Sequence, residues 1–101
     1  MNNGRLDFVY IASAALAQAR TLVPSWLPGG RLQGHEWVVI NPTRGDRKPG
    51  SFSVNLTTGR WADFASGDRG GDLVALAAYL RGIRQGEAAR ELVHELGVNL
   101  E

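Results

Sequence analysis

The sequence predicts a single α+β domain, in which a small antiparallel sheet of about three strands packs against an N-terminal helix and a C-terminal helix pair. Apolar residues recur at helical spacing near both ends of the chain, and apolar and polar residues alternate between residues 35 and 64. Segments rich in glycine and proline separate these regions. The chain of 101 residues, 44% hydrophobic and 21% charged, has the length and composition of one globular domain.

Residues 1–24 are expected to contain the first helix. Asp7 suits its N-cap, and Pro24 is expected to end it because proline lacks the amide hydrogen. The apolar face follows the i, i+3, i+4 spacing through Phe8, Ile11, Ala12, Ala15, Leu16, Ala19, Leu22 and Val23. Residues 25–34 are expected to form an irregular connector that Trp26 and Leu27 hold against the core.

The sheet is expected within residues 35–64. Its strands are the segments 35–40 (HEWVVI), 51–55 (SFSVN) and 60–64 (RWADF), which are rich in β-branched and aromatic residues. The intervening segment NPTRGDRKPG contains two prolines and two glycines and is expected to be a loop. Thr57-Thr58-Gly59 suits a three-residue hairpin loop with a left-handed Gly59 beside a bulge.

That loop length determines the predicted pairing of the last two strands. The pairs are Leu56–Arg60, Val54–Ala62 and Phe52–Phe64. This pairing makes one face apolar and leaves Trp61 and Asp63 on the other. A four-residue loop would place Phe52 opposite Asp63, and we therefore prefer the three-residue loop.

Residues 65–97 are expected to form a glycine-rich loop followed by two helices. Asp72 suits the N-cap of a nearly all-apolar helix that Gly82 ends. A last helix over about residues 85–96 is expected to end at Gly97. Its outer face carries three glutamates at i, i+4 spacing, so any nucleic acid would approach from elsewhere.

Composition excludes several functional classes. The absence of cysteine excludes disulfides and thiolate zinc sites, and His35 and His94 lie too far apart to form a metal-ligand motif. The chain has no apolar run long enough to cross a membrane and no signal-peptide layout, so we expect a cytoplasmic protein. The net charge is only +1, but ten of the eleven basic residues are arginine. Arginine suits phosphate recognition, although GC-rich coding gives the same bias.

Residues 36–97 carry an ordered set of short motifs. These are Asn41-Pro42-Thr43-Arg44, Lys48-Pro49-Gly50-Ser51-Phe52-Ser53-Val54-Asn55, Gly59, Trp61, Gly70-Gly71-Asp72 and the helix pair that ends in EAARELVHELG. In this order they resemble the N-terminal zinc-binding domain of bacterial and phage DNA primases. They also resemble a domain at the head of mobile-element primase–helicase proteins.

The resemblance implies a zinc-ribbon-like fold and a role in DNA replication, as a template-recognition or DNA-tethering domain. The positions of the four zinc ligands hold Asn41, Arg44, Phe64 and Gly67, so we expect a metal-free version without a cofactor. A buried Phe64 ring and local hydrogen bonds of Asn41 are expected to help replace the metal. Leu100-Glu101 is typical of a cloning scar, so we expect residues 1–99 to be one module of a longer protein.

Basic residues near the predicted hairpin suggest a nucleic-acid site. Arg44, Arg47, Lys48 and Arg60 supply positive charge, and Trp61 is expected to be an exposed stacking platform. Ser51, Ser53 and Asn55 would donate hydrogen bonds to phosphates, and Arg69 would contact another. The partner is then single-stranded DNA, or RNA. The alternative is that the charges form a solvated loop and that Trp61 is half-buried.

Other candidate sites are weaker. The carboxylates of Asp63, Asp68 and Asp72 could bind Mg²⁺, but Asp72 caps a helix and Asp63 could pair with Ser53 or Arg44. Residues 67–71 lack the spacing and lysine of a phosphate-binding loop.

No nucleophile–base pair is evident, so we expect this domain not to be an enzyme; the sequence leaves open whether the longer parent is one. The alternative function is a metal-free docking domain of a replication protein, with the weakly charged face of the first helix as its contact surface.

Overall fold

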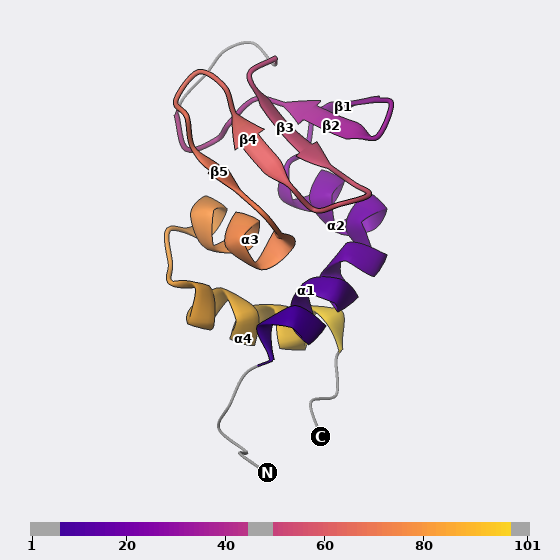
Figure 1. Cartoon of the computed structure of the whole chain (residues 1–101), viewed down its shortest axis with the longest axis vertical. Helices are drawn as coiled ribbons and strands as arrows, with labels where there is room; N and C mark the ends of the chain where they lie inside the picture. Colours follow the sequence, from indigo (N-terminus) through magenta and orange to yellow (C-terminus); the bar gives the residue numbers. More distant parts are fainter. Residues whose placement is uncertain (1–6, 45–49, 98–101) are drawn as a thin grey trace.

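In the computed structural model, which describes residues 7–44 and 50–97, a five-stranded antiparallel sheet is covered on one face by helices (Figure 1). The strands are β1 (Arg31–Gln33), β2 (Glu36–Val39), β3 (Phe52–Asn55), β4 (Trp61–Asp63) and β5 (Arg69–Gly70), and each pairs with the next along the chain. The helices are α1 (Phe8–Ala17), α2 (Ala19–Trp26), α3 (Leu73–Arg81) and α4 (Gln85–Leu96). The α+β class is therefore confirmed.

The expected single N-terminal helix is two helices. Asp7 caps α1 as predicted, since its side chain accepts a hydrogen bond from the Tyr10 amide at 2.9 Å. The chain leaves helical geometry at Gln18, which is the C-cap of α1 and the N-cap of α2. The prediction that Pro24 ends the helix is wrong. Pro24 lies inside α2, which stops only at Trp26, so the chain keeps helical geometry for two residues beyond the proline.

The expected three strands are also too few. β1 lies in the predicted connector and pairs with β2 through a two-residue loop in which Gly34 is left-handed (φ 62°). β5 lies in the predicted glycine-rich loop and pairs with β4. Both are short edge strands without the alternating pattern that marks a half-buried strand, so the sequence gives little sign of them.

The predicted register of the β3–β4 hairpin is wrong by one residue. Phe52 opposes Asp63 and Val54 opposes Trp61, across a four-residue loop that ends at a left-handed Gly59 (φ 83°). The Asn55 side chain fixes this loop, because its Oδ1 accepts hydrogen bonds from the amides of residues 57 and 58. Since side chains alternate across a strand, the shift turns Trp61 and Asp63 inward.

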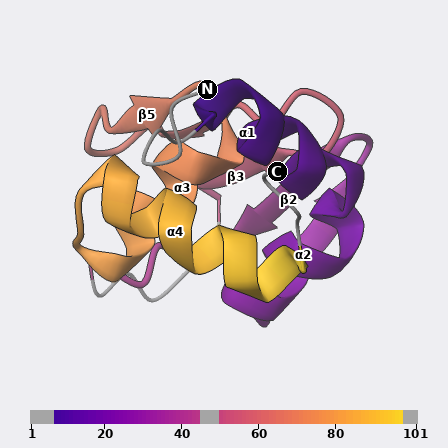
Figure 2. The same cartoon turned by 90° about the horizontal axis from the view of Figure 1, so that it is seen from below.

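Two apolar clusters fill the interior. The first lies between the sheet and the helices α1, α2 and α3, and includes Ala15, Val23, Val39, Phe52, Val54, Trp61 and Leu76. The second lies between α1, α3 and α4, farther from the sheet, and includes Ile11, Val74, Ala77, Ala88 and Leu92. Figure 2 shows α1, α3 and α4 stacked beside one another beneath the sheet. Among the described residues, the helices therefore cover the inner face of the sheet, and none of them lies over the outer face.

The ends of the C-terminal helices are as predicted. Asp72 caps α3 by accepting a hydrogen bond from the Ala75 amide at 2.8 Å. Gly82 and Gly97 end α3 and α4 in left-handed conformation, at φ 65° and 67°. Within the described ranges, none of the helices combines the length and apolar character needed to cross a membrane.

Gly70 gives the Trp61 indole its space. A Cβ added at residue 70 would lie 2.5 Å from the indole, whereas a Cβ at Gly71 would have nothing within 4 Å. We expect Gly70→Ala to lower the free energy of unfolding by about 1–3 kcal/mol through overpacking. We expect Gly71→Ala, the matched control, to change it by less than about 0.5 kcal/mol. Urea unfolding measures both; equal midpoints for the two variants would contradict this packing.

Candidate functional site

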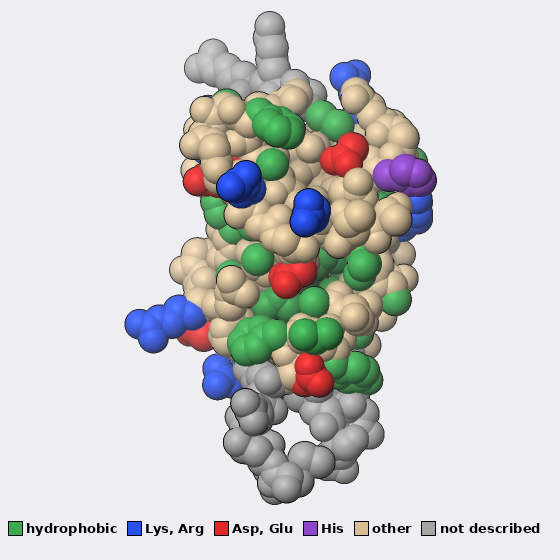
Figure 3. Space-filling view, in the orientation of Figure 1, with side chains coloured by type: hydrophobic (Ala, Val, Ile, Leu, Met, Phe, Trp, Pro, Cys, Tyr) green, Lys and Arg blue, Asp and Glu red, His purple; other side chains and the backbone are tan. Residues whose placement is uncertain are grey.

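A groove of about 680 Å³ runs across the outer face of the sheet. Its lining residues come from β2 to β5 and the adjoining turns, and they include Glu36, Ser53, Asn55, Arg60, Ala62, Phe64 and Arg69. In Figure 3 basic side chains lie over the part of the molecule that the sheet occupies, next to an acidic side chain and patches of hydrophobic surface. This groove is the candidate site.

Strand pairing arranges the groove in rows. One row contains Glu36, its partner Asn55, and Arg60, whose carbonyl accepts a hydrogen bond from the Asn55 amide at 2.7 Å. The next row contains Ser53, Ala62 and Arg69. Phe64 lies beyond it, where its amide donates a hydrogen bond to the Ser51 carbonyl at 2.8 Å. Alternate residues of a strand are about 6.6 Å apart, so the groove extends over roughly two such intervals.

Arg60 and Arg69 supply the positive charge of the groove. Both side chains are exposed. Among residues 7–44 and 50–97, neither arginine forms an ion pair. Their guanidinium groups therefore remain available to an anionic ligand, and a planar guanidinium matches the geometry of a phosphate.

The exposed aromatic residue at the groove is Phe64, not Trp61. The Phe64 side chain is 79% exposed, so the expectation that it fills the core in place of a zinc ligand is wrong. The indole of Trp61 is only 5% exposed and packs 4.8 Å from the Tyr79 ring, measured between centroids. Its Nε1 donates a hydrogen bond to the Asp72 carbonyl at 3.1 Å. The prediction that Trp61 is an exposed stacking platform is therefore wrong, because the one-residue register shift exchanges the two faces.

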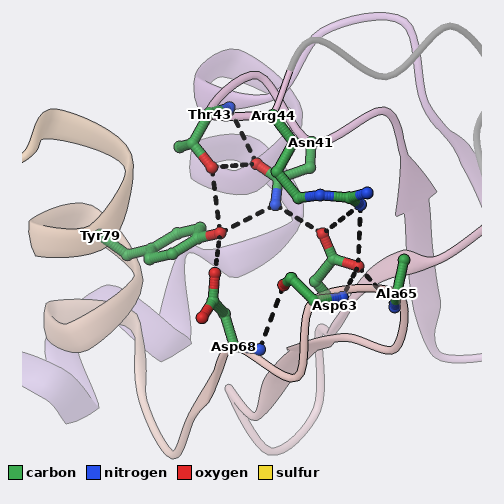
Figure 4. Close-up of polar contacts among 8 residues, drawn as sticks. Asn41, Thr43, Arg44, Asp63, Ala65, Asp68 and Tyr79 are labelled. Atoms are coloured by element: carbon green, nitrogen blue, oxygen red, sulfur yellow. Dashed lines mark hydrogen bonds and ion pairs between the residues drawn. The ribbon is translucent and has the colours of Figure 1, made fainter.

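A buried polar network lies next to the groove, on the inner side of the sheet (Figure 4). Asn41 and Asp63 are fully buried, and the Asn41 Nδ2 donates hydrogen bonds to Asp63 Oδ2 at 2.7 Å and to the Tyr79 hydroxyl at 2.9 Å. The amide and hydroxyl of Thr43 both donate to Asn41 Oδ1. The Tyr79 hydroxyl donates to Asp68 Oδ2 at 2.7 Å. The network thus joins the loop after β2, the loop after β4 and helix α3.

Asp63 is the acceptor at the centre of this network. Arg44 Nη1 lies 3.0 Å from Asp63 Oδ2, and the amides of Ala65 and Ser66 donate to Oδ1. Burial alone would raise the pKa of Asp63, but the hydrogen bonds from Asn41, Ala65, Arg44 and Ser66 outweigh burial and hold that pKa well below its usual range. The carboxylate is therefore charged across the physiological pH range.

The network accounts for two positions that the resemblance matches to zinc ligands. Asn41 and Arg44 both bond Asp63, whose own carbonyl accepts a hydrogen bond from the amide of Gly67, a third such position. The expected pairing of Asp63 with Arg44 is confirmed. Over the described ranges, no group of three or more histidine and acidic side chains is arranged to hold a metal ion.

The structure brings together only part of the predicted nucleic-acid site. Ser53, Asn55, Arg60 and Arg69 line the groove, and so does the otherwise buried Trp61. Arg44 contacts the buried Asp63, and Ser51 lies outside the groove lining. Arg47 and Lys48 lie outside the described residues.

Glu36 and Phe64 also line the groove, although the sequence did not indicate either as a binding residue. The signal that could have found Phe64 is the Asn-Leu-Thr-Thr-Gly segment, because an asparagine that caps its own turn favours the longer loop.

No protein-family model matches the chain, and no curated protein matches it.

Proposed function

We propose that this domain binds single-stranded DNA along the outer face of its sheet, as a module of a phage or mobile-element primase–helicase. The observation that carries the proposal is the groove itself. Two arginines without ion pairs among the described residues flank it, and an exposed phenyl ring stands at its end. A cationic groove with an aromatic platform is the general arrangement by which proteins hold single strands.

Each groove residue has a distinct part in the proposed mechanism. Arg60 and Arg69 hold successive phosphates, and the Ser53 hydroxyl, which lies in the same row as Arg69, donates to the nucleic-acid backbone. A base stacks on Phe64, which replaces Trp61 in the role first predicted from the sequence. The motif resemblance to primase zinc-binding domains supports the assignment to replication. The domain positions a strand and performs no chemistry of its own.

The experiment is a titration of fluorescent single-stranded DNA at several salt concentrations. Two phosphate contacts predict a slope of log K against log salt of about −1.4, and Arg60→Ala or Arg69→Ala should each reduce its magnitude by about 0.7. Arg90→Ala, which removes an exposed arginine on α4, is the matched control and should change nothing. Equal losses in all three variants, or binding that is independent of salt, would refute this use of the groove.

A second candidate function is protein docking. Phe8, Val9 and Tyr10, in the first turn of α1, are 40%, 78% and 47% exposed. In Figure 3 hydrophobic surface also gathers over the lower part of the molecule, where α1 lies. This patch favours a protein contact away from the groove. Absence of DNA binding, together with self-association that Val9→Glu abolishes in sedimentation experiments, would favour docking.

A further inference from the structure

Resting on the proposed function, we propose that the groove discriminates between bases and prefers cytosine to uracil or thymine through the Glu36 carboxylate. The two kinds of pyrimidine differ at position 4, where cytosine carries an amino donor and uracil or thymine a carbonyl acceptor. A fixed carboxylate beside the strand would accept a hydrogen bond from the amino group of cytosine and would repel the carbonyl oxygen of uracil or thymine.

Glu36 occupies the right place for such a contact. It is the first residue of β2, lies on the outer face opposite Asn55, and lines the groove together with Arg60. Phe64 stands at the other end of the same groove. A strand held by the arginines would therefore place one base against Phe64 and present another to Glu36.

Hydrogen bonds hold the Glu36 carboxylate in position. Asn55 Nδ2 donates to Glu36 Oε2 at 2.8 Å. The side-chain amide of Asn55 does not flip easily, because its Oδ1 already accepts hydrogen bonds from the backbone amides of Thr57 and Thr58. Asn55 therefore acts as a positioning residue that orients the carboxylate of its neighbour.

The carboxylate also keeps an acceptor for a ligand. Within the described part of the chain, Oε1 of Glu36 has no hydrogen-bond partner and Glu36 forms no ion pair, although Arg60 lies in the same row. An ionised carboxylate offers acceptors only. The other charges of the groove attract phosphate, whereas a carboxylate without an ion pair repels the phosphates of a nucleic acid. A contact between this carboxylate and a base accounts for its presence in the groove.

The test compares short oligo-dC with oligo-dU at neutral pH and low salt, because these bases differ only in the amino or carbonyl group at position 4 and in the hydrogen that uracil carries on N3. We expect oligo-dC to bind about five- to tenfold more tightly, the lower part of the range for base contacts because the groove is open to water. Glu36→Gln keeps the side-chain size but adds a donor, so the ratio should fall to about one. Glu91→Gln, which changes a carboxylate on α4, should keep the wild-type ratio.

The outcomes separate the two proposals. Equal binding of both oligomers by the wild type, or a ratio that Glu36→Gln leaves unchanged, would overturn base discrimination alone. Absence of binding to either oligomer would overturn the proposed function itself. The wild-type ratio decides the question even if the Glu36 variant folds poorly.

Discussion

Replacing Asp63 with alanine is expected to lower the free energy of unfolding by about 3–5 kcal/mol. The change removes the Asp63 acceptor from the Arg44 guanidinium, the buried Asn41 amide and the backbone amide of Ala65. Glu91→Ala breaks a more exposed pair with Arg81 and should cost about 1 kcal/mol or less. Urea unfolding of the two variants makes the comparison, and similar midpoints would contradict the structural role of the network.

The pH dependence of stability provides a second measurement on Asp63. Because the folded state lowers the pKa of this carboxyl, its stabilisation is complete above its ordinary pKa of about 3.9 and is lost as the pH falls below it. Asp63→Asn has no such proton to gain. The difference in stability between wild type and Asp63→Asn should therefore shrink on acidification below about pH 4. A constant difference would contradict the lowered pKa.

Trp61→Ala is expected to affect stability and Phe64→Ala to affect DNA binding, although the two residues are only three positions apart. Trp61→Ala should cost about 3–5 kcal/mol of stability, because a buried indole and its hydrogen bond to Asp72 are lost. Phe64→Ala should change stability by less than about 0.5 kcal/mol. It should weaken single-stranded DNA binding by about 1–3 kcal/mol, the value of one stacked base.

Thermal unfolding and DNA titration together check this pair of variants. If the Trp61→Ala protein is stably folded but no longer binds DNA, Trp61 is the exposed stacking platform that the sequence predicts. If the Phe64→Ala protein binds DNA as tightly as the wild type, the phenyl ring takes no part in binding.

Local chemistry made four of the helix ends predictable. Asp7, Asp72, Gly82 and Gly97 act on backbone groups within a few residues of themselves, so their roles can be read from the sequence around them. The helix break at Gln18 has no comparable local signal, because the residues on both sides of it, Ala15 and Ala19, are buried in the same apolar cluster.

The sheet register depended on contacts that are distant in sequence. An inward Asp63 is unfavourable when β4 is considered alone, because a buried carboxylate is costly without partners. Its partners Asn41 and Arg44 lie about twenty residues earlier and Tyr79 joins from α3, and every buried side-chain nitrogen or oxygen among the described residues is hydrogen-bonded. No strand pattern contains that information.

Only part of the charge of the candidate site, the two arginines, was therefore predictable, and the face on which each aromatic residue lies was not. Arg60 and Arg69 were found because exposed arginines can be recognised by residue type. Phe64 and Trp61 exchanged roles because a one-residue slip reverses every side chain of a strand. Predictions of surface aromatics on short strands are accordingly only as good as the register on which they depend.

The most direct test of the central claim is a nuclear magnetic resonance titration of the labelled domain with unlabelled single-stranded DNA. The account predicts amide shifts at the groove residues Ser53, Asn55, Arg60, Ala62, Phe64 and Arg69 that saturate together, with little change along α4. Shifts confined to α1 or α4, or no shifts at all, would show that the outer face of the sheet is not a DNA-binding surface.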